Sequence, residues 1–259
     1  MMRLLWGKTN QSARNREPVR LVIAWFSDLG VTLLGGLLLL AAVPSFAGGS
    51  VESPGLPKRA ASVAGFVPPG WVIEQQLPGN FNRDGRADAL VLLSKAPTAV
   101  EQSPADSSAA RLSTPRVIAV LLGTRNGYEL SASNGRLVPQ VDLNNQEDPM
   151  TDSELSVRPG GFDIRIGMTA GGGSYLGAAL HYRFRHQNGC FRLISFDRRE
   201  THRATLDTHD LSVNFLTGAV VLATGNAQSD ATRSRRERLA VNPRRCFQDL
   251  GSLVDFKPF

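Results

Sequence analysis

Alternation of apolar and polar residues is the dominant pattern of the chain beyond residue 62. Phe162, Ile164 and Ile166 alternate with polar or small residues, and a period of two places the apolar side chains on one face of a β-strand. No amphipathic helical period follows residue 47. The segments predicted as strands, some alternating and some continuously apolar, are 71–76, 87–93, 117–122, 128–130, 162–168, 180–184, 191–194, 211–215 and 219–222.

Short turn sequences separate these segments and predict antiparallel pairing. Asn126-Gly127 and Asn188-Gly189 each stand between apolar runs, and Asn-Gly pairs favour two-residue hairpin turns because both residues adopt positive φ at low cost. We therefore predict an all-β fold. Its strands form an antiparallel meander of eight or nine strands, arranged as a barrel, a sandwich or a strongly curved sheet.

The first 47 residues differ from the rest of the chain. Residues 1–20 hold five basic residues and one acid, a fifteen-residue apolar run covers 29–43, and small residues precede a cleavage position after Ala47. These are the three parts of a secretory signal peptide, and the run is shorter than the about 20 residues of a spanning helix. We expect a signal helix that directs export to the periplasm or the medium. The alternative is an uncleaved anchor, which would be the only membrane contact.

Composition divides the remainder of the chain. Residues 48–62 contain Gly, Ser and Pro and predict a flexible leader, and residues 96–115 predict a surface loop inserted between strands. A single β domain is expected over 63–230. An Arg-rich C-terminal tail is expected over 231–259.

Much of the positive charge belongs to the targeting segment. Without the five basic and two acidic residues of 1–47, the formal net charge falls from +6 to +3. Six arginines still gather within 233–245. Such a run is solvated at the surface, or it attaches the protein to anionic lipid or polysaccharide by Coulomb attraction. Nucleic acid is not an expected partner, because an exported protein rarely meets it.

Two cysteines, Cys190 and Cys246, both follow the export segment. Two cysteines in an oxidising compartment predict one disulfide, which would join the C-terminal tail to the β domain. The alternative is a pair of unrelated thiols, because the sequence specifies no distance between them.

The register of one hairpin predicts a basic patch. A two-residue turn at Asn188-Gly189 places Arg185 opposite Arg192 and Arg183 opposite Ile194. Like charges in opposite positions are unfavourable unless an anion lies between them. The predicted patch consists of Arg165, Arg183, Arg185 and Arg192. The alternative is that these side chains extend separately into water.

Residues 80–88 have the pattern of a calcium-binding loop. Oxygen-bearing side chains alternate along it, and Gly85 permits a sharp turn. The candidate calcium ligands are Asn80, Asn82, Asp84, Arg86 through its carbonyl, and Asp88. Only two are carboxylates and Val91 holds the twelfth position, so we expect weak binding, with Kd of about 10⁻⁴–10⁻³ M. The alternative is a polar turn in which Asn and Asp accept bonds from backbone amides.

The loop lies between a Trp-containing strand and an apolar strand. Over residues 71–93 this arrangement resembles the FG-GAP and VCBS-type repeats of extracellular proteins, which bind calcium in all-β modules. With segments 182–194 and 214–218, the chain also resembles a group of exported, functionally uncharacterised bacterial proteins that carry such a loop. The resemblance implies export, an all-β body and a calcium site. It implies no catalytic residue, because none is established for that group. Asn80 departs from the Asp usual at its position.

Familiar enzyme motifs are missing from the sequence, which has no H-E-x-x-H, phosphate-loop or G-x-S-x-G motif. We predict a non-catalytic exported protein of the cell envelope that binds an unidentified envelope ligand or protein, with a weak structural calcium loop. A hydrolase of envelope glycan is an alternative that rests on Asp84, Asp88, Asp163 and Asp197. Electrostatic attachment to anionic lipid or polysaccharide is a third.

Overall fold

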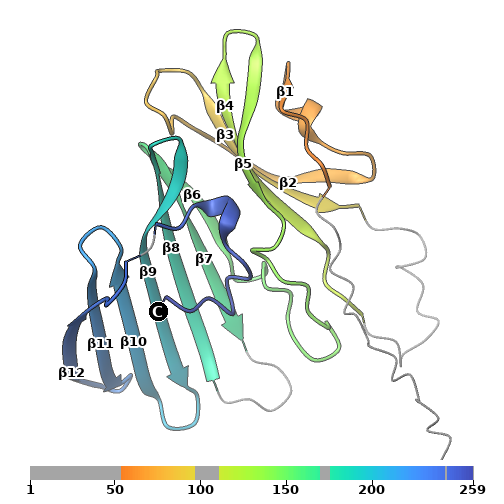
Figure 1. The fold of residues 1–259 in the computed structure, drawn as a ribbon. Helices are drawn as coiled ribbons and strands as arrows, with labels where there is room; N and C mark the ends of the chain where they lie inside the picture. Colours follow the sequence, from red (N-terminus) through yellow and green to blue (C-terminus); the bar gives the residue numbers. More distant parts are fainter. Residues whose placement is uncertain (1–53, 97–110, 170–175, 243, 259) are drawn as a thin grey trace, which may run out of the picture. The chain divides into compact units, whose positions relative to one another are not determined.

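The computed structural model describes residues 54–96, 111–169, 176–242 and 244–258 (Figure 1). The predicted signal helix and most of the predicted insertion at 96–115 lie outside the described residues. The described chain is all-β, as predicted. Its elements are β1 (Arg59–Ala60), η1 (Val63–Phe66), β2 (Trp71–Gly79), β3 (Asp88–Lys95), β4 (Arg116–Thr124), β5 (Gly127–Asn134), β6 (Glu154–Arg158), β7 (Gly161–Thr169), β8 (Leu176–Gln187), β9 (Cys190–His202), β10 (Asp207–Asn214), β11 (Ala219–Asn226), β12 (Ser229–Arg238) and η2 (Phe247–Asp249), where η denotes a 3₁₀ helix.

The strands form two antiparallel sheets. One has five strands in the order β1-β5-β4-β3-β2, and the other is a seven-stranded meander that runs from β6 to β12. The described strands do not close into a barrel, because each sheet begins and ends on different strands. The twelve strands observed exceed the eight or nine predicted, because β1, β6 and β12 are short or polar and show little apolar alternation.

Central strands of the five-stranded sheet are continuously apolar because both of their faces are covered. Leu90 and Leu92 belong to the core shared with the seven-stranded sheet. Val91 and Leu93 point to the opposite face, where they form a second cluster with Phe66 of η1. A strand buried on both sides loses the alternation of a half-exposed strand.

The seven-stranded sheet has the alternation that the sequence predicts. Phe162, Ile164 and Ile166 of β7 are buried in the core. Asp163 and Arg165 lie between them in sequence and therefore project from the opposite face. One face of this sheet thus packs against the core, and the other presents polar side chains.

One hydrophobic core contains residues of both sheets and of the C-terminal segment. Phe81, which belongs to the predicted calcium loop, contributes to it, so core packing holds that loop in place. Buried Asn134 donates through Nδ2 to the carbonyl oxygens of Phe247 at 2.7 Å and Leu250 at 2.9 Å. The rings with centroids 4.9–6.2 Å apart are Phe81, Phe162, Phe184, Phe191 and Phe247.

The β8–β9 hairpin confirms most of the predicted register. Its turn is Asn188-Gly189, with φ of 54° and 72°. Arg185 pairs with Arg192, as predicted. The predicted pairing of Arg183 with Ile194 is wrong, because a β-bulge shifts the register by one residue at this point.

The β4–β5 turn differs in detail from the predicted one. Thr124 pairs with Gly127, so the two turn residues are Arg125 and Asn126, and neither has positive φ. Gly127 instead begins β5 with φ of 125°. A Cβ atom there would lie 2.3 Å from the carbonyl oxygen of Ala60, so the glycine permits β1 to approach β5.

The folded domain extends beyond the predicted 63–230 at both ends. Arg59 in the predicted leader pairs with Glu129 of β5. The first arginines of the predicted tail form β12, an edge strand exposed along its whole length. Leu250 and Leu253, further along the tail, are buried in the core. β12 is a polar edge strand without apolar alternation, so no residue pattern predicted it.

Candidate functional site

Asp88 closes the predicted calcium loop from the first position of β3. Its side chain is buried. Oδ2 accepts a hydrogen bond from the Phe81 amide at 2.6 Å, and Oδ1 accepts one from the Gly123 amide of β4 at 2.8 Å. The carboxylate therefore ties both ends of the loop together and joins them to the neighbouring strand.

Asp84 lies at the exposed tip of the loop. Oδ1 accepts a bond from the Arg86 amide at 2.8 Å, and Oδ2 pairs with the Arg86 guanidinium at 2.7 Å. The Asn82 side chain accepts from the Asp84 amide at 3.1 Å and donates back to Oδ2 at 3.1 Å. The backbone amide of Arg86 is the main cause that holds the pKa of Asp84 below its ordinary value. These bonds form a local polar turn, the alternative considered for this sequence.

Asn80, at the first ligand position, differs from the other loop residues. Its Oδ1 atom is buried and has no hydrogen-bond partner among the described residues. Buried polar oxygens in proteins nearly always have a partner. Across the described part of the chain, no group of three or more His, Cys, Asp or Glu side chains is arranged to hold a metal ion.

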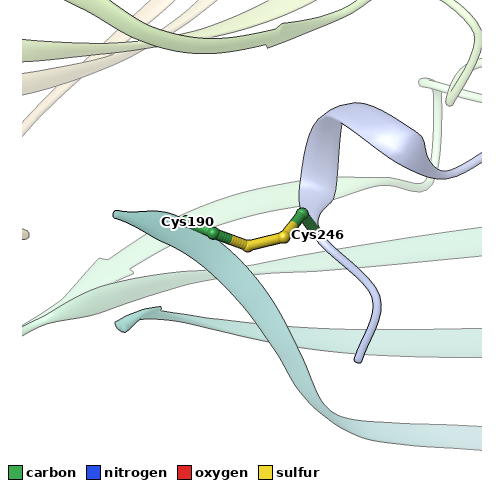
Figure 2. The surroundings of a disulfide bond; sticks show 2 residues. All are labelled: Cys190 and Cys246. Carbon is green, nitrogen blue, oxygen red and sulfur yellow. A yellow bond between two sulfur atoms is a disulfide. The ribbon is translucent and has the colours of Figure 1, made fainter. Parts of the chain in front are cut away.

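The predicted disulfide forms between Cys190 and Cys246 (Figure 2). Cys190 begins β9 and Cys246 precedes η2, and their Cα atoms are 5.8 Å apart, within the usual range for a disulfide. The backbone of Cys246 also bridges to Arg192. The bond fits an oxidising environment outside the cytoplasm.

Arginines of the predicted basic patch lie on β7, β8 and β9, but they do not form one unpaired group. Arg165 pairs with Glu154 at 2.7 Å. Arg183 lies 3.7 Å from a carboxylate oxygen of Asp163. Arg192 is half-buried and donates to the carbonyl oxygen of Phe215. Arg185, opposite Arg192, has no carboxylate within salt-bridge distance among the described residues.

A row of polar side chains crosses the face of the seven-stranded sheet that lies away from the core. His181 Nε2 lies 3.1 Å from Asp163 Oδ2, and His181 Nδ1 lies 3.9 Å from Asp197 Oδ2. Arg158 donates to Asp163 at 2.7 Å, and Ser212 donates to Asp197 at 2.5 Å. One imidazole is therefore placed between two carboxylates, each with a further donor.

Sequence reasoning named both of these carboxylates but missed the histidine between them. The register predicted for β8 and β9 places Phe196 opposite His181. The β-bulge shifts this pairing by one residue, so His181 faces Asp197. The row therefore depends on an irregularity that no residue pattern indicated.

An open hollow of about 580 Å³ lies along β10, β11 and β12. Most of its lining residues are polar, and they include Arg233 of the edge strand β12. Arg233 belongs to the segment predicted as a tail, and the pairing of β12 with β11 brings it to the hollow.

No family model, curated protein or solved structure matches this chain. In the parts of the chain that the structure describes, no helix is long and apolar enough to span a bilayer.

Proposed function

We propose that this protein is exported and works in the cell envelope as a non-catalytic binding module. The observation that carries the proposal is that each of the four carboxylates considered for hydrolysis already has a partner within the protein. Asp88 accepts two backbone amides, Asp84 pairs with Arg86, and Asp163 and Asp197 flank His181. All four therefore have hydrogen-bond or ion-pair partners within the protein. Export is supported by the disulfide and by the signal-like sequence of residues 1–47.

Two measurements test this proposal. Fractionation of cells that express the full chain should place it outside the cytoplasm, with the disulfide oxidised. Removal of residues 1–47 should leave it in the cytoplasm. The purified protein should release no reducing ends from envelope glycan. Retention of the full chain in the cytoplasm, or glycan release that is lost in a single-residue variant, would reject it.

Loop 80–88 is the proposed calcium site of this module. The orphaned, buried Oδ1 atom of Asn80 is the observation that supports a cation there. Asn82, Asp84 and Asp88 would supply further oxygens, because each carboxylate oxygen of Asp88 retains a lone pair beside its amide bond. The Asp84–Arg86 pair is exposed to solvent and therefore weak, so calcium can displace the guanidinium. Bound calcium would neutralise the carboxylates and stiffen the loop.

A glycan hydrolase remains the second candidate because of the row on the outer sheet face. His181 lies within 4 Å of carboxylate oxygens of both Asp163 and Asp197, an arrangement that can move a proton. If this row were catalytic, Asp163→Asn and Asp197→Asn would each abolish glycan release and leave the fold intact. Equal release by both variants and the wild type would exclude the row.

A further inference from the structure

Part of the lining of the hollow along β10–β12 has the same orientation as the sheet face that packs against the hydrophobic core. Val213 of β10 and Val220 of β11 are paired and buried on that face. Further along the same strands the positions with the same orientation are polar, and they include His209 and Thr224, which also pair. These positions line an open polar hollow of about 580 Å³, to which Thr208, Gly225 and Thr232 of the opposite orientation also contribute. The volume suits a small organic ligand.

A β-bulge shapes this part of the sheet. The register of β11 and β12 shifts between Thr224 and Asn226, and bulges re-aim the side chains around them. Gly225, at the shift, lines the hollow. A Cβ atom on it would lie 3.3 Å from both the Ala231 carbonyl oxygen and the Thr232 Oγ1 atom, so a larger residue would crowd the hollow.

Among the described residues that line the hollow, Arg233 is the cation without an ion-pair partner. Other arginines of the sheet already have partners: Arg235 on the same strand pairs with Glu237, and Arg198 of β9 pairs with Glu200. The Asp207 carboxylate accepts bonds from Thr205 and Asn226 side chains. Among the described residues no carboxylate lies within salt-bridge distance of Arg233. A guanidinium with its donors unused is suited to bind a carboxylate in a bidentate manner.

The remaining lining favours a hydroxylated ligand over a lipid. Thr224 pairs with Arg233 across the strands, and His209, Ser229 and Thr232 also line the hollow. Ala231 is the only apolar side chain of the lining residues. A site that inserts into a membrane surface needs a large apolar face beside its cations, and this hollow has none.

We propose that the hollow binds an acidic sugar residue of an anionic polysaccharide, with Arg233 on the carboxylate and the Thr224 hydroxyl and His209 on the sugar hydroxyls. This inference rests on the proposed function, because an exported protein is the one that meets such a polymer. Arg235 follows on the same face of β12, about 7 Å along the strand. Its guanidinium pairs with Glu237, so Arg233 is the arginine of this face that is left for the sugar carboxylate.

Titration of the full chain with polygalacturonate, and with neutral dextran as control, tests the site. Arg233→Gln should weaken polygalacturonate binding about tenfold, as expected for the loss of a bidentate charged contact. Arg238→Gln is the matched control, since it removes the same charge from the same exposed strand and does not line the hollow. It should change the affinity less than about twofold. Both variants should melt like the wild type, because neither arginine is buried.

Four results would overturn the inference: absence of polygalacturonate binding by the wild type, equal losses in the two variants, equal affinity for dextran, or tighter binding to phosphatidylglycerol vesicles than to the polymer. Equal losses would indicate a diffuse charge effect. The proposed function fails separately, if fractionation finds the full chain in the cytoplasm. In that case Arg233-dependent polygalacturonate binding would still establish the hollow as a site for acidic sugars.

Discussion

Asp88 shows how one buried side chain organises the loop between β2 and β3. Its two oxygens accept bonds from the amide of Phe81 in the loop and the amide of Gly123 in β4. Burial of a carboxylate is tolerated when hydrogen bonds compensate for its lost hydration. Asp88 therefore stabilises the loop without a cation, and any cation that binds would add to hydrogen bonds that are already formed.

Asp88→Ala should lower the free energy of unfolding by about 2–4 kcal/mol, because it leaves two amide donors without acceptors. Urea unfolding at neutral pH measures this. Asp84→Ala is the control, since its carboxylate is at the exposed loop tip, and without calcium it should lower the free energy of unfolding much less than Asp88→Ala does. Equal losses in the two variants would show that Asp88 has no special structural role.

Calcium should raise the thermal midpoint of the wild-type protein by a few degrees at about ten times Kd, where binding adds about 1.4 kcal/mol. Magnesium at the same concentration should have a smaller effect, because it prefers to keep its waters. Asp84→Ala should remove the calcium shift. A midpoint that is the same in chelator and in calcium would reject the proposed ion site.

At the scale of the element, strand pairing explains what could be predicted from the sequence. The alternation in β7 and the Asn188-Gly189 turn are local signals, so the meander and part of its register were predictable. The ligand candidates of loop 80–88 are also neighbours in sequence. The His181 row and the Arg233 hollow each depend on a shift of register between two paired strands. No residue pattern within one strand indicates such a shift.

β12 illustrates a different limit of sequence reasoning. All ten of its residues are exposed, so its alternation carries no apolar signal. Arginines on an edge strand also oppose pairing with the edge of another molecule. The charged residues of β12 therefore give no apolar pattern in the sequence, and they oppose association of this sheet edge with another molecule. Arg233 stays accessible to solvent.

Tyr182 links β8 to the C-terminal segment through its hydroxyl, which donates to the Leu253 carbonyl oxygen at 2.6 Å. Burial raises the pKa of this phenol above its ordinary value. The folded state thus keeps a proton that the unfolded chain releases above about pH 10, so stability falls with rising pH by up to about 1.4 kcal/mol per unit.

Tyr182→Phe should lower the free energy of unfolding by about 1 kcal/mol at neutral pH, through loss of that hydrogen bond. It should also reduce the decline in stability above about pH 10, because the variant has no phenol to titrate. Urea unfolding from about pH 8 to about pH 11 measures both effects. An unchanged alkaline decline would mean that the phenol is not protected from ionisation.

For the whole molecule, the disulfide joins segments that are 56 residues apart in sequence. It returns the chain after β12 to the start of β9, where Phe247 and Leu253 then enter the core. Asn134 and Tyr182 bond the same segment independently of the sulfur atoms. The C-terminal segment should therefore stay docked without the disulfide, and the bond should act mainly on the unfolded chain.

The double variant Cys190→Ser, Cys246→Ser tests this division of roles. In the chain-entropy model, a disulfide that closes a loop of this length stabilises the folded state by about 4 kcal/mol. The free energy of unfolding should fall by about this amount, which lowers the urea midpoint. Amide hydrogen exchange below the transition should still protect β8 and η2, because packing and hydrogen bonds hold them together. Wild-type protein that is reduced and alkylated should lose a similar amount. Selective loss of protection at the C-terminal segment in native buffer would instead show that the disulfide itself holds that segment in the folded state.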